Sequence, residues 1–357
     1  MRCQSDGASE LRRAGVGSTV EGVNGEESKA TKATKATKVA AEERAGVPLT
    51  NLDQPLFDGA GATKRDLIDY LDAMSDRIIP VLLGRPLSVI RVHRGQEAFM
   101  QKNLPTYAPE WVERVRWWAE TSRRDVDYAL CDDRRTLLWF GNQRAIEYHP
   151  MLVRADRPDH MTHLVLDLDP PSADEFAVVV RVARAVRTAL DEVGLAGALK
   201  TSGAKGLHVF VPLADDVAID DAAAATRALA QRAAALEPDV ATTAFMREDR
   251  EGKVFVDATR SGGATVVATY SPRVRPGVPV SFPLDWDDLD DVAPADLTIR
   301  TVPTLLGGHD PWSERMPAPQ RLPSELVAEG HEVPVARVQA MHEGKRRARA
   351  RREPPAI

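Results

Sequence analysis

Two aspartates separated by one residue are the clearest candidates for chemistry in this 357-residue sequence. They lie in the apolar run from His163 to Pro170, whose other members are mostly leucine and valine. Alternate side chains of a strand share a face, so Asp167 and Asp169 should project together, with Cα atoms about 6 to 7 Å apart. Two such carboxylates repel strongly unless a cation lies between them. Two Mg²⁺ or Mn²⁺ ions roughly 3.5 to 4 Å apart would satisfy them, because these metals prefer oxygen ligands.

A third acid strengthens this interpretation, since an Asp-x-Asp pair alone also occurs at many solvated strand ends. Asp257 ends the apolar stretch that starts at Lys253, and an antiparallel neighbour would bring it beside the pair. Three carboxylates suit two-metal phosphoryl transfer, in which one metal activates a 3′-hydroxyl and the other neutralises the triphosphate and leaving pyrophosphate. Taken alone, Asp257 would more often be a turn-forming acid ahead of residues 259–262.

The segment from Lys200 to His208 supplies the complementary positive charge. We expect Ser202, Lys205 and the exposed amides around Gly203 and Gly206 to cradle phosphates, with His208 donating a further hydrogen bond. A Gly-x-x-Gly segment is often only a turn. Its place between two strands, directly after the Asp-x-Asp strand and its helix, favours the phosphate interpretation.

Basic residues lie on both sides of the third acid. Arg247, Arg250 and Lys253 precede it, and Arg273 and Arg275 follow it. Surface arginines are most often merely solvated, but these bracket the position where a triphosphate would lie.

The elements that must position these residues alternate between strand and helix patterns in the second half of the chain. The capping-box residues Ser172 and Glu175 predict the start of a helix that runs to Gly194, and an alanine-rich helix is expected from about residue 221 to 236. Strands are expected at 163–169, 198–201, 207–211, 254–257 and 264–270. This order favours an α+β fold with a mostly antiparallel sheet flanked by helices.

The first half predicts a compact N-terminal α/β module. Residues 64–83 have helical periodicity, which Pro80 and the Gly84-Arg85-Pro86 sequence should interrupt. Short strands are expected at 87–92, 126–130 and 136–140, followed by a segment that ends at residues 147–150.

The ends of the chain differ in composition from its middle. Residues 1–46 have almost no large apolar side chains, which predicts a disordered tail, and residues 321–357 should be a basic tail with its densest run at 345–352. Either tail could contact nucleic acid or be inert. The domain between them is expected at 47–320, with the N-terminal module at 47–155 and the catalytic sheet at 156–320.

Composition restricts the class of protein. With 43% apolar and 28% charged residues the chain should be an ordinary globular protein, and a net charge of −6 argues against coating nucleic acid through bulk positive charge. Its two cysteines are far apart, so neither a disulfide framework nor a cysteine zinc site is expected. Without a signal peptide or membrane span in the sequence, we expect a cytoplasmic, nucleoid-associated protein with no membrane partner.

These motifs together resemble the polymerase domain of bacterial DNA ligase D, a member of the archaeo-eukaryotic primase superfamily. The resemblance covers residues 50–312 and therefore implies a primase-polymerase fold. The matching segments are 99–103, 147–150, 166–170, 200–208, 254–257, 270–277 and 280–286.

The resemblance also implies roles for individual residues. It makes Asp167, Asp169 and Asp257 the ligands of two Mn²⁺ or Mg²⁺ ions. The groups that would bind the incoming NTP or dNTP are His149, Ser202, Gly203, Lys205, His208, Arg250 and Arg273. Phe99 and Lys102 match positions that stack on the template and contact the 5′-phosphate at a gap or break. The implied partners are gapped or broken DNA with a 5′-phosphate, the end-binding protein Ku and a separate ATP-dependent DNA ligase, in non-homologous end joining.

The chain departs from the family pattern at two places. Phe99-Met100 replaces two aromatic residues, which predicts weaker or differently shaped stacking on the template. The sequence from Asp257 to Ser261 replaces Asp-Tyr-Leu-x-Asn, so the usual asparagine is missing. Because neither a ligase lysine motif nor a nuclease segment is present, we expect a stand-alone polymerase domain.

Two alternatives remain open from the sequence. The first is a catalytically weak paralogue that only binds DNA ends. The second is a metal-dependent glycosyltransferase, which also uses Asp-x-Asp but offers no account of Lys205, His208 or Arg273.

Overall fold

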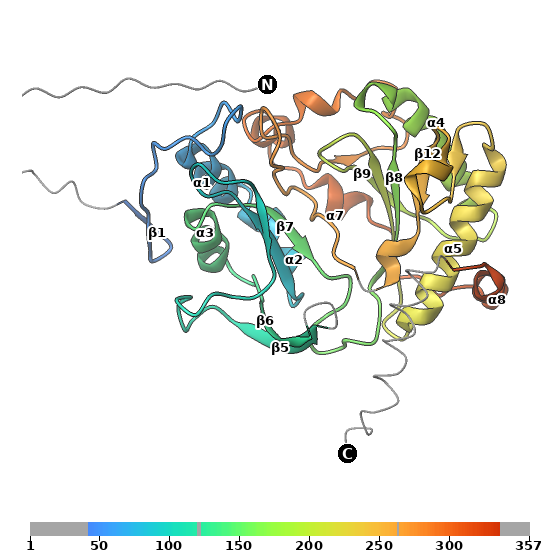
Figure 1. Cartoon of the computed structure of the whole chain (residues 1–357), viewed down its shortest axis with the longest axis horizontal. Coiled ribbons are helices and arrows are strands. Elements are labelled where there is room, and N and C mark those ends of the chain that lie inside the picture. Colours follow the sequence, from blue (N-terminus) through green and yellow to red (C-terminus); the bar gives the residue numbers. More distant parts are fainter. Residues whose placement is uncertain (1–41, 120–122, 263, 336–357) are drawn as a thin grey trace, which may run out of the picture. The chain divides into compact units, whose positions relative to one another are not determined.

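The computed structural model describes residues 42–119, 123–262 and 264–335 (Figure 1). Its second half is built on a six-stranded sheet in which only the β11–β12 pair is parallel. The strands, in spatial order, are β11 (Ala241–Thr242), β12 (Val254–Asp257), β8 (His163–Asp169), β10 (Leu207–Pro212), β9 (Ala198–Thr201) and β13 (Pro283–Leu284). The expected α+β fold with a mostly antiparallel sheet is confirmed.

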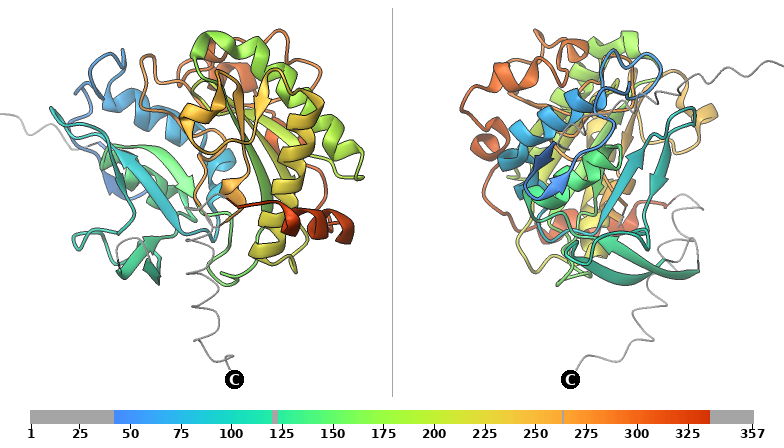
Figure 2. Two further views of the ribbon diagram at one scale, coloured as in Figure 1. Left: turned by 45° about the vertical axis from the view of Figure 1, so that its right-hand side comes forward. Right: turned by 90° about the vertical axis from the view of Figure 1, so that its left-hand side faces the viewer.

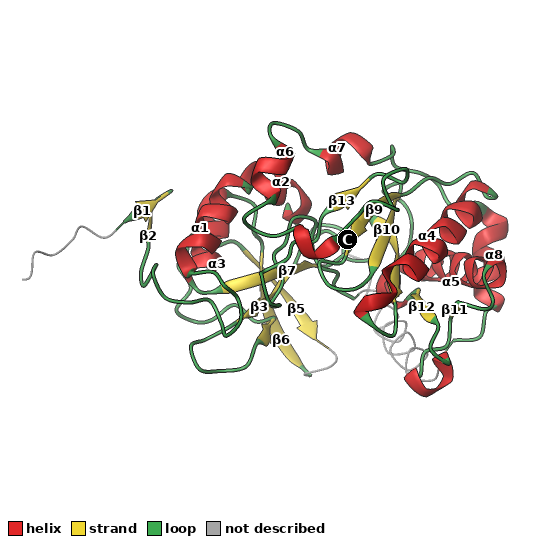
Figure 3. Ribbon diagram, turned by 90° about the horizontal axis from the view of Figure 1, so that it is seen from above, coloured by secondary structure: helices red, strands yellow, loops and turns green. Residues whose placement is uncertain are grey.

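The strand β8 has one apolar and one polar face because its sequence alternates. Leu164, Leu166 and Leu168 are fully buried. The helices α4 (Phe176–Asp191) and α5 (Ile219–Leu236) pack against β8 and against each other, and Figure 3 shows them together on one side of the sheet. The alanine-rich sequence of α5 permits this close approach. The opposite face is therefore left to Asp167 and Asp169.

The N-terminal module contains a second antiparallel sheet (Figure 2). Its strands follow the order β4 (Phe99–Gln101), β3 (Leu87–Arg91), β6 (Arg124–Ala129) and β5 (Arg114–Ala119), with β7 (Ala145–Pro150) also paired to β3. Three helices accompany it, α1 (Lys64–Ala73), α2 (Ser75–Leu82) and α3 (Arg134–Asn142). A capping box between Thr63 and Asp66 starts α1.

Two predictions for this module were wrong in detail. The expected strand at 136–140 is the helix α3, which Asp133 caps by accepting a hydrogen bond from the amide of Thr136 at 2.6 Å. A short apolar run is compatible with either a buried helix or a buried strand, and the cap decides between them. The helix expected at 64–83 is instead divided at Met74, and Pro80 lies inside α2 rather than ending it.

Two predictions for the second half also need correction. The expected strand at 264–270 is an irregular segment with one isolated bridge, between Thr265 and Met151, and Tyr270 there has a φ of 65°. Ser172 does not cap a helix through the backbone. A 3₁₀ turn, η1 (Ala173–Glu175), intervenes before α4.

Residues next to the domain in both expected tails, 1–46 and 321–357, form regular structure instead. A two-stranded ribbon forms from β1 (Glu43–Arg44) and β2 (Val47–Pro48), and Arg44 forms an ion pair with Asp69 of α1 at 2.6 Å. At the other end α8 (Ser324–Glu332) packs on α5 with Leu326 buried. The basic run at 345–352 and most of the N-terminal tail lie outside the described residues.

The remaining elements are short. They are η2 (Arg247–Arg250), η3 (Thr259–Gly262), η4 (Pro294–Asp296), α6 (Val302–Leu306) and α7 (Pro311–Arg315). Within the described residues, no helix has the length and apolar character that crossing a bilayer requires.

The two sheets share one hydrophobic core, whose buried residues come from both. The segment after residue 264 runs beside β7, since the amide of Ala268 donates to the carbonyl of Tyr148 at 2.8 Å and the amide of Tyr148 donates to the Ser271 hydroxyl at 2.9 Å. The end of β7 is therefore held beside the second sheet.

Candidate active site

Three carboxylates meet on the polar face of the second sheet. In the antiparallel pairing of β12 with β8, Asp257 lies directly opposite Asp167. Directly opposed residues have Cα atoms about 4.5 to 5.5 Å apart and side chains on the same face. Asp169 follows two residues later on that face, so the expected convergence of the three acids is confirmed by the strand register.

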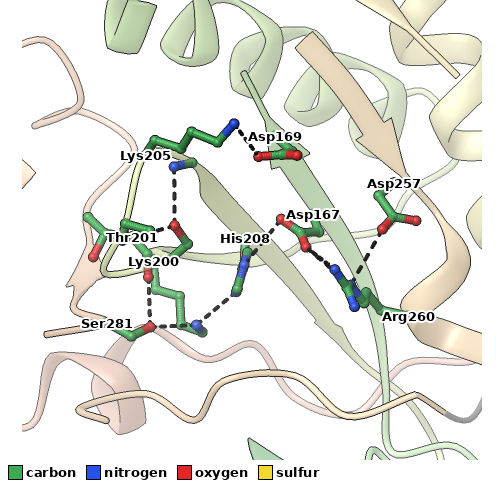
Figure 4. Close-up of polar contacts among 12 residues, drawn as sticks. Asp167, Asp169, Lys200, Thr201, Lys205, His208, Asp257, Arg260 and Ser281 are labelled. Carbon is green, nitrogen blue, oxygen red and sulfur yellow. Dashed lines mark hydrogen bonds and ion pairs between the residues drawn. The ribbon is translucent and has the colours of Figure 1, made fainter. Parts of the chain in front are cut away.

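The same rung continues across the sheet with basic residues. His208 on β10 is opposite Asp167, and Lys200 on β9 is opposite His208. Figure 4 shows the side chains of this row turned toward one another. Two acids, an imidazole and an amine thus form one line across four strands.

A chain of hydrogen bonds fixes this row. Nζ of Lys200 donates to the Ser281 hydroxyl at 2.6 Å and lies 2.9 Å from Nδ1 of His208. Nε2 of His208 is 3.2 Å from Oδ1 of Asp167. The network therefore assigns the proton of a neutral His208 to Nε2, from which it is directed at the carboxylate.

The electrostatic environment shifts the pKa values of the two opposed acids, Asp167 and Asp257, in opposite directions. Burial would raise the pKa of Asp167, but His208 and Arg260 outweigh it and hold that pKa well below its ordinary value. Burial, together with the charge of Asp167, raises the pKa of Asp257. Burial also lowers the pKa of His208 to about 4, so this imidazole is neutral near pH 7.

Arg260 bridges the opposed acids. Its guanidinium lies 3.1 Å from Oδ2 of Asp167 and 3.5 Å from Oδ2 of Asp257 (Figure 4). It comes from η3, immediately after β12, where the family motif has a different sequence. The two carboxylates thus have a cation between them that belongs to the chain itself.

Asp169 has its own basic partners. Nζ of Lys205 is 3.2 Å from Oδ1, and Nη1 of Arg250 is 3.6 Å from Oδ2. Arg250 also stacks over the Phe255 ring, with 3.9 Å between its Cζ and the ring centroid. Every one of the three acids therefore has a nearby positive charge.

The hairpin that carries Lys205 is closed by its own serine. The Ser202 hydroxyl accepts hydrogen bonds from the amides of Ala204 and Gly206, at 3.2 and 3.1 Å. The prediction of exposed amides was therefore wrong for Gly206. A Cβ there would lie 2.1 Å from the carbonyl oxygen of Leu168, so glycine is needed for the close approach to β8.

A second cluster of charges comes from β7. His149 donates to Glu147 at 2.8 Å, and Nε of Arg273 lies 3.0 Å from the same carboxylate, whereas Nη1 of Arg273 donates to the carbonyl of Ser202. Burial opposes ionisation of Glu147, yet the bonds from His149 and the charge of Arg273 lower its pKa to about 2. This buried carboxylate holds both basic residues in the cavity that the three acids line.

A cavity of about 530 Å³ collects these groups. It contains all three acids and every predicted nucleotide-binding residue except Gly203. Gly203 has a left-handed φ of 67°, and a Cβ there would lie 2.7 Å from Cγ of Arg273, so the turn requires glycine. Lys205 and five arginines line the cavity, the latter being Arg247, Arg250, Arg260, Arg273 and Arg275. The excess of positive charge suits a polyphosphate together with a cation.

The predicted DNA-contacting residues lie apart from this cavity. Phe99 is on β4 at the edge of the N-terminal sheet with 38% of its surface exposed, and Met100 beside it is 45% exposed. His93 stacks near Phe99 with ring centroids 5.2 Å apart. Lys102 follows the strand and is also exposed.

The donor chemistry of the acids fits Mg²⁺ or Mn²⁺, because three carboxylates share one polar cavity. Within the part of the chain that the structure describes, no three acidic, imidazole or thiol groups close on one point as they stand. Arg260, Lys205 and Arg250 instead compensate the acids. The acids are thus neutralised by basic side chains in this structure, and a bound metal would supply the same positive charge in their place.

The sequence interpretation missed three residues of the site. Lys200 is buried on β9, and only the register of β9 with β10 shows that it supports His208. Ser281 is buried just before β13 and accepts a hydrogen bond from Lys200. Glu147 was seen as part of a motif, but its role in holding His149 and Arg273 depends on the contact between β7 and the 266–274 segment.

Comparisons with known proteins identify the family of this chain. The family described as the LigD primase-polymerase domain matches residues 63–312. The multifunctional non-homologous end joining DNA repair protein LigD of Mycobacterium tuberculosis is 35% identical over 292 residues, which is 78% of this chain and 38% of that protein. The bifunctional LigD of Bacillus subtilis is 33% identical over 260 residues, 71% of this chain and 41% of that protein.

The chain thus spans about two fifths of the length of these relatives. A solved structure, the polymerase domain of Mycobacterium tuberculosis ligase D in complex with DNA, superposes with a TM-score of 0.70 and 33% identity. The match covers 77% of this chain and 98% of that one. The chain therefore belongs to the LigD primase-polymerase domain family, whose members are metal-dependent nucleotidyltransferases.

Proposed function

We propose that this protein adds nucleotides, under the direction of a template, at gaps or broken ends of DNA during non-homologous end joining. The observation that supports this most directly is the placement of Asp167, Asp169 and Asp257 in one cavity with Lys205 and five arginines. The names of its relatives, which are end-joining proteins, support the biological setting.

In this proposal the three acids hold two divalent ions, Mn²⁺ or Mg²⁺, which when bound lower the pKa of the primer 3′-hydroxyl and neutralise the triphosphate. His208 positions Asp167 through its Nε2–H, and Lys200 orients His208 in turn. Lys205, Arg250 and Arg273 lie within the cavity where they can bind phosphate oxygens. Release of Arg260 from the acids would accompany metal binding.

Phe99 and Lys102 are proposed to contact the template and the 5′-phosphate of the downstream strand. Their exposure at a sheet edge supports this, and a related polymerase domain has been solved with DNA. Replacing Phe99 with Ala should weaken binding of a gapped duplex about tenfold, since a base–aromatic stack contributes about 1–3 kcal/mol. Fluorescence anisotropy would measure this, and unchanged affinity would exclude Phe99 from the DNA interface.

The remaining partners are also proposals. We expect the chain to work with Ku and a separate ATP-dependent DNA ligase in the cytoplasm, associated with the nucleoid. Copurification with Ku and a ligase from cells would test this assignment.

The catalytic proposal is tested by extension of a labelled primer in a gapped, 5′-phosphorylated duplex with Mn²⁺ and each NTP or dNTP in turn. We expect incorporation of the complementary nucleotide, with ribonucleotides used at least as well as deoxyribonucleotides. Asp167→Ala and Asp169→Ala should abolish extension. Extension that survives both substitutions would disprove the site.

One observation favours a second candidate, a paralogue that binds DNA ends with little catalysis. Arg260 occupies the space between two of the acids and could oppose metal binding. The same assay decides, because this candidate predicts binding of the gapped duplex by the parent protein without extension at any metal concentration.

A further inference from the structure

A second cavity of about 480 Å³ lies next to the active-site cavity, and Val266 and Val267 line both. It is enclosed by α2, the end of β7, the start of β8 and α7. Its volume lies within the usual range of small-ligand sites. None of the acids, Lys205 or His208 takes part in it.

Aromatic rings form its floor. The rings of His163 and Phe210 meet edge to face with centroids 5.7 Å apart, and those of Phe210 and Trp312 meet in the same way at 5.3 Å. Burial near Arg85 and Arg154 lowers the pKa of His163 to about 3, so its ring is neutral. The lining thus includes aromatic rings, which are the side chains that pack best against a planar ligand.

Three guanidinium groups line the walls without acidic partners. Arg77 donates to the carbonyls of Gly307 and His309, Arg154 to that of Leu83, and Arg85 to Met151 and the Thr162 hydroxyl. Among the described residues, no carboxylate lies within ion-pair distance of these three.

Two carboxylates, Asp76 and Asp310, line the same cavity, and Asp310 accepts a hydrogen bond from the Tyr270 hydroxyl. With His163 neutral, the lining therefore carries a net positive charge. An anion would compensate it without any metal.

The wall also contains an unsatisfied hydroxyl. Oγ1 of Thr269 is buried, with the residue 1% exposed, and it has no hydrogen-bond partner among the described residues. Buried hydroxyls are nearly always bonded to protein or water, so this one retains unused hydrogen-bonding capacity in the wall of the cavity. By contrast Asp76, Arg154 and Ser313 are exposed and form an open rim.

We propose that this cavity binds a nucleoside monophosphate unit, with the phosphate on Arg77 and Arg154 and the base against Phe210 and Trp312. The Thr269 hydroxyl bonds the base or sugar. A planar ring, an anionic group and a hydrogen-bonding edge match the three features of the lining together. The unit is either a free nucleotide or one nucleotide of a DNA strand that passes from the neighbouring cavity.

The probe is adenosine 5′-monophosphate, titrated into the full chain in EDTA while tryptophan fluorescence is recorded. Trp312 is the only tryptophan that lines either cavity among the described residues, so Trp312→Phe identifies the signal from this site. We expect a saturable change that Trp312→Phe removes.

Two variants test the assigned contacts. Arg154→Gln should raise the Kd about tenfold or more and Thr269→Val about threefold to tenfold, as expected for a charged and a neutral hydrogen bond. Arg157→Gln, a nearby exposed arginine that does not line the cavity, is the matched control and should stay within about twofold.

The outcomes are distinct. No Trp312-dependent change, or a change that Arg154→Gln and Thr269→Val leave unaltered, overturns the proposal. If inorganic phosphate binds as tightly as adenosine 5′-monophosphate, the aromatic floor contributes nothing to binding and its proposed role is overturned. Displacement of the nucleotide by gapped duplex assigns the site to a DNA strand, and its absence assigns the site to a free nucleotide.

Discussion

The two cavities compensate their positive charge in different ways. In the active-site cavity Arg260, Lys205 and Arg273 each lie within 3.5 Å of a carboxylate. In the second cavity Arg77 and Arg154 bond only to backbone carbonyls. The first arrangement can accept a cation and a polyphosphate together, because its acids and bases can exchange partners. The second can accept an anion without a metal.

The difference follows from how each cavity is built. Strand register places Asp257, Asp167, His208 and Lys200 in one row. The second cavity is assembled from α2, α7, the ends of two strands and the irregular 266–269 segment. Its arginines bind carbonyls at helix ends that no strand ladder uses, namely those of Leu83, Gly307 and His309.

The largest expected effect is the loss of primer extension caused by Asp257→Asn, a substitution in the active-site cavity that leaves the second cavity unchanged. It removes one charge but keeps the size of the side chain and an oxygen for the Thr259 amide. Primer extension should fall about a thousandfold or more, because electrostatic stabilisation is usually the largest catalytic contribution. Asp291→Asn is the control. Parental extension by Asp257→Asn would show that this acid is not required.

A smaller effect is expected for Arg260→Gln. Without the guanidinium, Asp167 and Asp257 repel each other, so Mn²⁺ should bind about tenfold more tightly in the absence of nucleotide. Electron paramagnetic resonance of free Mn²⁺ measures this affinity. Arg154→Gln, which changes the second cavity, should leave it unchanged. Weaker Mn²⁺ binding by Arg260→Gln would mean that Arg260 supports the metal site instead of competing with it.

A third effect, on stability and not on activity or metal binding, concerns pH and the second cavity. Folding lowers the pKa of His163 from its ordinary value near 6.5 to about 3, so the unfolded chain binds a proton more readily than the folded one. The free energy of unfolding therefore decreases as pH falls from about 6.5 towards 3. Replacing His163 with Phe should remove on the order of 2 kcal/mol of this decrease, measured by urea unfolding at pH 7 and pH 4. Equal pH dependence in both proteins would contradict the shift.

Local periodicity was sufficient to predict the acids. The period-two alternation in β8 placed Asp167 and Asp169 on one face, and the apolar stretch before Asp257 predicted a neighbouring strand. Antiparallel pairing of these two strands then brings all three acids to one face of the sheet. The helices α4 and α5 were also predicted, although their starts were not.

Other features depend on contacts that the sequence does not show. Lys200 is recognisable as a partner of His208 only when the register of β9 and β10 is known. The apolar run of α3 was compatible with a strand until its cap at Asp133 was seen. Likewise, the second cavity joins residues from α2, β8, β10 and α7, which no local pattern connects.

The most direct test of the catalytic proposal is the number of Mn²⁺ ions bound per chain with a non-hydrolysable nucleoside triphosphate and a gapped duplex, counted by electron paramagnetic resonance. The proposal predicts two ions for the parent protein and fewer for Asp167→Asn, with DNA binding retained. Equal numbers of bound ions in both proteins would contradict the assignment of the three aspartates as the metal site.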